Sequence, residues 1–169
     1  TYMYLAQDSL IFKPTYETDP VESVFSGASE FFIDTPQGNR LQTWYKPAKV
    51  GKETLVYLHG NARNLSTRGR LIELLSEDER GLLIFSWGGF GQSIGTPSEQ
   101  SFYDDARAVF DWLAKEHNLE SSDLIIYGES LGTGVAVQLA NERDFKGVIL
   151  AAPYTSIAQM AANDYPWLP

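Results

Sequence analysis

The sequence contains no cysteine and only two histidines among its 169 residues. The absence of cysteine excludes disulfide bonds, thiolate metal sites and a cysteine nucleophile. An imidazole base could come from only two positions, His59 and His117. Nothing in the sequence has the spacing of metal ligands, so we expect no metal and no other cofactor.

Long apolar runs and basic clusters are also missing. No stretch approaches the roughly 20 apolar residues that cross a bilayer, and residues 1–10 lack the basic start and continuous apolar segment of a signal peptide. The net charge is −9, which argues against a nucleic acid or an anionic membrane as partner. Because the sequence begins at a threonine, any membrane association would come from a segment upstream. A cytoplasmic or membrane-associated location is favoured, and the oligomeric state is left open.

Short apolar runs typical of strands covered on both faces recur along the chain. They lie at 55–58, 82–85, 124–127 and 148–151. Before them, residues 31–45 alternate around a turn at 35–38, which predicts an antiparallel hairpin, and residues 1–26 predict an extended arm. We therefore expect residues 1–169 to form one α/β domain, with an antiparallel amino-terminal hairpin and a mostly parallel sheet that has helices on both faces.

Amphipathic segments between these runs predict the helices. One begins near Ser66 and places three leucines on a single face: Leu71, Leu74 and Leu75. A second covers about three turns from residue 102, and Ser101 with Asp104 fits a capping box at its start. A third, at 131–140, is almost entirely small or apolar, so we expect it to be buried nearly all round.

The third helix follows the pattern G-x-S-x-G, with Ser130 at its centre and Glu129 beside it. A serine nucleophile must stand clear of the backbone on a sharp turn between strand and helix, with small residues two positions away on each side. Gly128 and Gly132 meet that requirement. The alternative is a tight glycine-rich turn with an incidental serine. The strand, corner and helix favour the nucleophile, which makes Ser130 the predicted catalytic residue.

A second candidate loop follows the first buried run and reads His59-Gly60-Asn61-Ala62. In hydrolases that use the serine corner, one oxyanion donor comes from this loop and the other from the residue after the serine. The expected donors are therefore the backbone amides of Asn61 and Leu131, and Gly60 would allow close approach. The alternative is an ordinary turn in which Asn61 or Asn64 caps a helix.

Neither histidine is expected to act as the base. His59 precedes Gly60 and is interpreted as a structural residue that orders the oxyanion loop, while His117 lies at a helix end where a solvated histidine is typical. A third glycine-rich stretch, residues 86–97, contains G-x-G after a strand. Its third glycine comes one place late for a dinucleotide loop and Pro97 interrupts it, so a structural loop is favoured over a nucleotide site.

Together these motifs resemble the α/β-hydrolase superfamily, in particular the bud-emergence-protein-like, abhydrolase domain-containing branch of serine hydrolases. The matching stretches, in order, are residues 7–14, 59–62, 89–99, 111–113, 128–132, 152–156 and 165–169. They cover almost the whole chain. One departure is Ser86-Trp87-Gly88, where the family more often has an acidic residue, a tyrosine and an arginine.

The resemblance implies a catalytic triad in the order serine, aspartate, histidine, with the last two after later strands. Asp164 is too close to the 148–151 run for that role, and no histidine follows Ser130. We therefore interpret residues 1–169 as the amino-terminal part of a serine hydrolase, inactive alone, whose complete form would cleave a small acyl ester, or an amide or thioester, through an acyl-enzyme. An open apolar sheet edge at 148–151 would follow.

Two alternatives remain at this point. The chain could be a noncatalytic interaction module with an α/β-hydrolase-like fold that lacks a base. Less favoured is a nucleotide-binding protein that uses residues 88–95.

Overall fold

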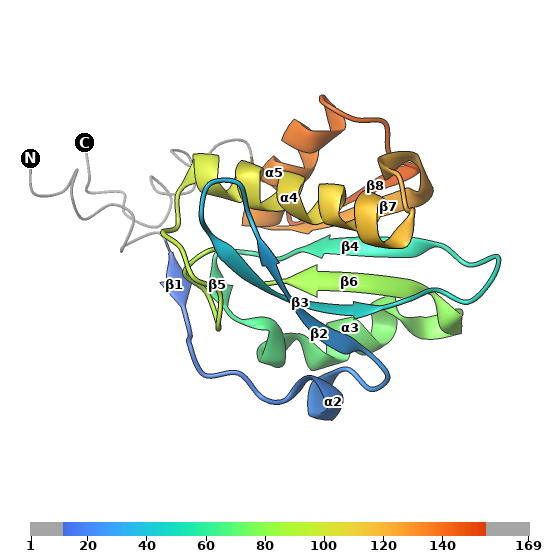
Figure 1. Cartoon of the computed structure of the whole chain (residues 1–169), viewed down its shortest axis with the longest axis horizontal. Helices are drawn as coiled ribbons and strands as arrows, with labels where there is room; N and C mark the ends of the chain where they lie inside the picture. The colour runs from blue at the N-terminus through green and yellow to red at the C-terminus, as the bar shows by residue number, and fades with distance from the viewer. Residues whose placement is uncertain (1–11, 155–169) are drawn as a thin grey trace, which may run out of the picture.

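The computed structural model describes residues 12–154, which form a six-stranded sheet with helices on both faces (Figure 1). The strand order is β2-β3-β6-β4-β7-β8. The bounds are β2 Ser29–Asp34, β3 Arg40–Lys46, β4 Thr54–Leu58, β6 Gly81–Phe85, β7 Leu124–Glu129 and β8 Gly147–Ala151. Strands β2 and β3 are antiparallel, and β3 also runs antiparallel to β6, whereas β6, β4, β7 and β8 are mutually parallel. The predicted α/β fold with an antiparallel hairpin is thus confirmed.

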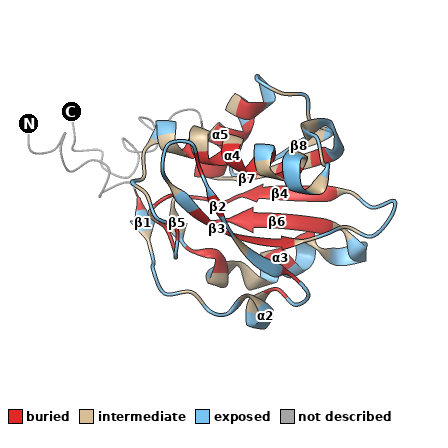
Figure 2. Cartoon of the chain, in the orientation of Figure 1, coloured by how far each residue is buried: buried red, intermediate tan, exposed pale blue. Residues whose placement is uncertain are grey.

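The sheet separates two apolar clusters, because successive side chains of a strand point to opposite faces. On β4, Val56 and Leu58 belong to the cluster under α4 Glu99–His117 and α5 Leu131–Ala140. Leu55 and Tyr57 belong to the cluster on the face of α3 Gly69–Leu75. Figure 2 shows the central strands β4 and β6 as buried throughout.

The helices differ in detail from the sequence prediction. The predicted first helix is a 3-10 turn, η1 Leu65–Arg68, followed by α3. In α3, Ile72 and Leu75 are buried, whereas Leu74 is 55% exposed. In α5 Val137 is 46% exposed, so that helix is not buried all round.

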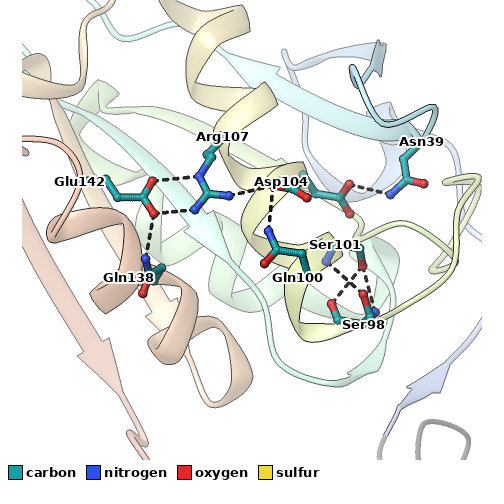
Figure 3. A network of polar contacts seen from close by, with 9 residues as sticks. Asn39, Ser98, Gln100, Ser101, Asp104, Arg107, Gln138 and Glu142 are labelled. Atoms are coloured by element: carbon teal, nitrogen blue, oxygen red, sulfur yellow. Dashed lines mark hydrogen bonds and ion pairs between the residues drawn. The ribbon is translucent and has the colours of Figure 1, made fainter.

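The predicted capping box of α4 is one turn too late. The N-cap is Ser98, whose hydroxyl accepts from the Ser101 amide while the Ser101 hydroxyl accepts from the Ser98 amide. Asp104 instead pairs with Arg107, which also binds Glu142 beyond the end of α5 (Figure 3). The arginine therefore ties the two helices on that face together.

The amino-terminal arm is largely extended, as expected, over the part that the structure describes. It contains the short strand β1 Lys13–Pro14 and one helical turn, α2 Val21–Val24, which the sequence did not predict. Strand β1 pairs in parallel with β5 Ala62–Arg63, which begins at the last residue of the expected oxyanion loop. Two short 3-10 turns, η2 Glu77–Glu79 and η3 Ser121–Asp123, precede β6 and β7.

The last described strand forms an edge of the sheet. Strand β8 pairs with β7 along one side, and no strand within residues 12–154 pairs with its other side. Its central residues, Val148, Ile149 and Leu150, are 41%, 44% and 40% exposed. An apolar edge thus exists where the sequence predicts one.

Candidate active site

Ser130 occupies the corner between β7 and α5. Its backbone angles, φ 49° and ψ −115°, are unusual for a residue with a side chain. Its amide donates to the Ala151 carbonyl over 2.9 Å, which connects the corner to the end of β8. The Ser130 carbonyl accepts from the Thr133 hydroxyl over 2.6 Å, whereas the Ser130 hydroxyl makes no hydrogen bond within residues 12–154.

The two glycines of the motif let helix and strand close around the serine. A Cβ on Gly132 would overlap the backbone carbonyl of Leu58 on β4, and one on Gly128 would lie 2.6 Å from the Gly132 oxygen. Real Cβ atoms do not approach this closely. Both positions therefore require glycine for packing, whatever the role of the serine.

The expected oxyanion loop lies against the same corner. A Cβ on Gly60 would lie 3.4 Å from Ser130 Cβ and 3.9 Å from its Oγ. The structure therefore brings together two segments about 70 residues apart in sequence. As the first residue of α5, Leu131 has an amide with no acceptor inside the helix.

His59 orders the loop rather than facing the serine. It is 1% exposed, and its Nδ1 lies 2.7 Å from the Gly60 oxygen, which can only accept, so Nδ1 carries the proton. In a trans peptide the N–H points away from the C=O, so this bond sets the direction of the Asn61 amide. The backbone amide of Lys13 donates to the carbonyl of Asn61, which follows Gly60, over 2.9 Å.

The charge state of His59 agrees with this role. Burial, with a further contribution from the Arg68 charge, lowers the pKa of His59 to about 3. The imidazole is therefore neutral at physiological pH. Its Nε2 accepts a long hydrogen bond of 3.4 Å from the Trp87 amide, and the Trp87 indole donates to the His59 carbonyl over 3.0 Å. Both ring nitrogens are thus engaged by the backbone.

His117 lies at the opposite end of the fold. It ends α4, which runs back from the carboxyl edge of the sheet, where Ser130 lies, toward the start of β7 (Figure 1). Its ring packs against three aromatic side chains: Phe31, Tyr45 and Trp112. This environment is more enclosed than the solvated helix end expected from sequence. Within residues 12–154 neither histidine is placed to accept the Ser130 proton.

Glu129 anchors a polar cluster that sequence reasoning missed. The Tyr57 hydroxyl and the Arg68 guanidinium both donate to its Oε2, the latter over 2.7 Å. Burial is the main cause that raises the pKa of Tyr57, so the phenol keeps its proton and acts as donor. These partners are 72 and 61 residues away in sequence, and no local pattern connects them.

The glycine-rich loop at 86–97 is fixed by the protein itself. The Gly88 amide donates to Asp105 over 2.8 Å, the Ser93 hydroxyl donates to the Ser86 carbonyl over 2.7 Å, and the Gly91 amide donates to the Thr15 carbonyl over 3.0 Å. The Gly88 and Gly91 amides thus donate within the protein, and amides at the start of α4 are satisfied by its own capping box. These contacts fit the structural loop that the sequence favours.

Asp105 is a second residue that sequence reasoning missed. It is fully buried on α4 and accepts from Asn39 and Gly88, each over 2.8 Å. Burial raises the pKa of its carboxyl, while these two donors counteract the increase. It joins the hairpin turn, the glycine-rich loop and α4 at one point.

An open cavity of about 630 Å³ lies on the α3 face, beside Arg68 and Glu129 and along Leu71 and Leu74. Ser130 is not among its lining residues, so it is not the space into which the serine projects. Over residues 12–154 there is no group of three or more His, Cys, Asp or Glu side chains arranged to hold a metal ion. None of the helices in that range is long and apolar enough to span a membrane.

Comparison of the sequence with protein-family models identifies one matching family. The profile of the Hydrolase_4 family, described as serine aminopeptidase S33, matches residues 50–168. That is more than half of the chain. The chain belongs to this family.

Relatives and solved structures agree with this assignment. A Mycobacterium tuberculosis relative, the uncharacterized protein MT2364, is 35% identical over 172 residues, covering 100% of the chain and 61% of the relative. The mouse lysophosphatidylserine lipase ABHD12 is 38% identical over 130 residues, covering 72% of the chain and 32% of the lipase. The chain thus spans 61% or less of the length of these relatives. The resemblance to abhydrolase domain-containing proteins is confirmed.

The structural comparison confirms the fold. The esterase Pf2001 of Pyrococcus furiosus matches with a TM-score of 0.75 and 20% sequence identity, over 94% of the chain and 63% of the esterase. At this identity the likeness establishes the α/β-hydrolase fold. The candidate site of the Hydrolase_4 chain lies at the carboxyl edge of its parallel strands, where open α/β sheets carry their ligands.

Proposed function

We propose that this Hydrolase_4 chain supplies the nucleophile and the oxyanion-binding amides of a serine hydrolase that cleaves acyl esters. The observation that carries the proposal is the strained backbone of Ser130, together with the close approach of a second loop, where a Cβ added to Gly60 would lie 3.4 Å from Ser130 Cβ. The names of ABHD12, a lipase, and of Pf2001, an esterase, support ester cleavage as the reaction class.

In the proposed reaction Ser130 Oγ attacks the acyl carbonyl carbon and passes its proton to a base outside the described residues. The carbonyl oxygen becomes an oxyanion, bound by the amides of Asn61 and Leu131. The intermediate collapses when the alcohol leaves with the proton, and water then hydrolyses the acyl-enzyme by the same steps. Loss of one oxyanion donor lowers kcat by about 100-fold to 1,000-fold in enzymes of this type.

The test compares the complete product of the gene with residues 1–169 alone, using a short-chain aryl ester. We expect turnover by the complete protein, its loss in Ser130→Ala, and little activity in residues 1–169, because a serine without a base is a weak nucleophile. Ser101→Ala, which changes a helix cap away from the corner, is the matched control. Full turnover by Ser130→Ala would rule out the proposed nucleophile.

A second candidate function is a noncatalytic interaction module. It is favoured by the engagement of both His59 ring nitrogens and by the position of His117, which leave the serine without a base among residues 12–154. An inert complete gene product that also fails to react with a fluorophosphonate would favour the module over the enzyme.

A further inference from the structure

One side chain bonds to both loops of the candidate site. The Arg68 guanidinium donates from Nη1 to Glu129 Oε2 over 2.7 Å and from Nη2 to the Ala62 carbonyl over 3.0 Å. Glu129 directly precedes Ser130, and Ala62 directly follows Asn61. Each bond of the arginine therefore ends one residue from a group that the proposed reaction uses.

The geometry of the arginine makes this connection rigid. A guanidinium is planar and its two Nη atoms are held at a fixed separation, so the two bonds fix the Glu129 carboxylate relative to the Ala62 carbonyl. The Arg68 side chain is 15% exposed and that of Glu129 is 31% exposed, so water competes only partly for the bonds. Tyr57 also donates to Glu129 Oε2, which limits movement of the carboxylate.

The two expected amide donors lie on separate loops, so their spacing depends on a connection between those loops. One expected donor, the Asn61 amide, lies on the loop after β4, and the other, the Leu131 amide, lies at the start of α5. A single oxyanion needs both at hydrogen-bond distance at once, so the distance between the two loops must be fixed before reaction. His59 orients the first loop internally, but its hydrogen bonds reach Gly60 and Trp87 rather than the corner.

We propose that Arg68 is a positioning residue that fixes the spacing between the loop at 60–62 and the corner at 129–131. This inference rests on the proposed function. It adds a residue that stabilises the transition state through two backbone segments without touching substrate.

The kinetic test uses the complete gene product. We expect Arg68→Gln to lower kcat by about 10-fold to 100-fold with KM changed less than about twofold, because the misplaced donors serve the transition state and not the bound ester. The inhibition constant of benzeneboronic acid, which forms a tetrahedral adduct with the serine, should rise by a similar factor. Arg68→Lys should not restore kcat, because a single ammonium cannot replace the two Nη groups that donate to different acceptors.

Arg70→Gln is the matched control. Arg70 carries the same charge two residues away, is exposed, and makes no hydrogen bond or ion pair with a described residue. We expect its kcat and boronate inhibition to match the wild type. A kcat loss in Arg68→Gln without weaker boronate inhibition, or full activity in Arg68→Lys, would overturn the positioning role.

Amide hydrogen exchange tests the connection even if the protein hydrolyses no ester. We expect Arg68→Gln to speed exchange in peptides covering 59–64 and 129–132 by about tenfold and to leave the β6 peptide, 81–85, unchanged, whereas Arg70→Gln changes neither. An inert wild type with this pattern would refute the proposed function and keep the connection. Unchanged exchange at 59–64 would refute the connection itself.

Discussion

At the scale of single residues, the corner at Ser130 combines a strained backbone with a hydroxyl that makes no hydrogen bond within residues 12–154. A residue held at such angles costs about 1–3 kcal/mol, which the surrounding packing has to offset. The close approach at Gly128 and Gly132 provides that packing. The sequence pattern predicts the corner because the steric demand is local: it falls on residues that are two positions apart.

His59 gives a residue-scale prediction about acid stability. Its pKa is about 3 when folded and about 6.5 when unfolded, so below pH 6.5 the unfolded chain binds the extra proton and stability falls as pH falls. Between pH 7 and pH 5 this costs about 2 kcal/mol of unfolding free energy. We expect His59→Asn to lose about 2 kcal/mol less than the wild type over that range in urea unfolding. An equal decline in both proteins would contradict the buried, neutral imidazole.

At the scale of elements, the site depends on the approach of α5 to β4. We expect Gly132→Ala to lower the unfolding free energy by about 3 kcal/mol or more, because its methyl group would overlap the Leu58 backbone carbonyl. Gly60→Ala should cost less than about 1 kcal/mol, because its methyl group would meet Ser130 Cβ at an ordinary 3.4 Å. Denaturant titration of both variants measures the difference.

The two glycine variants should also separate stability from activity. The Gly60→Ala methyl group would lie 3.9 Å from Ser130 Oγ, beside the hydroxyl that the proposed reaction uses, so we expect a loss of turnover in a folded protein. A Gly132→Ala protein as stable as the wild type would contradict the close approach of α5 to β4 at Leu58.

Much of the arrangement of elements could be predicted from sequence, and the reason is physical. The buried parallel strands have continuous apolar runs, so the predicted 55–58 and 82–85 lie within one residue of β4 and β6. The sequence prediction for the cap of α4 is wrong because Ser98 and Ser101 each begin a pair of polar residues three positions apart, and only the backbone geometry selects between them. Arg68 and Tyr57 reach Glu129 across more than 60 residues, which no local pattern can reveal.

At the scale of the whole molecule, the exposed apolar face of β8 predicts self-association when residues 1–169 are expressed alone. Unpaired apolar edge strands recruit other strands, and a lysine on such an edge opposes this. We expect sedimentation to show concentration-dependent association that Ile149→Lys reduces. Val50→Lys, at an exposed apolar residue outside any strand, is the control and should have no effect. Purely monomeric behaviour of the unmodified chain at high concentration would contradict the prediction.

The bond from the Ser130 amide to the Ala151 carbonyl links that edge to the chemistry of the corner. The end of β8 is one hydrogen bond from the backbone that carries the hydroxyl, so any restraint on the outer strand is passed to the serine without an intervening loop. We therefore expect that another strand pairing along β8 would also restrain the backbone of the proposed nucleophile.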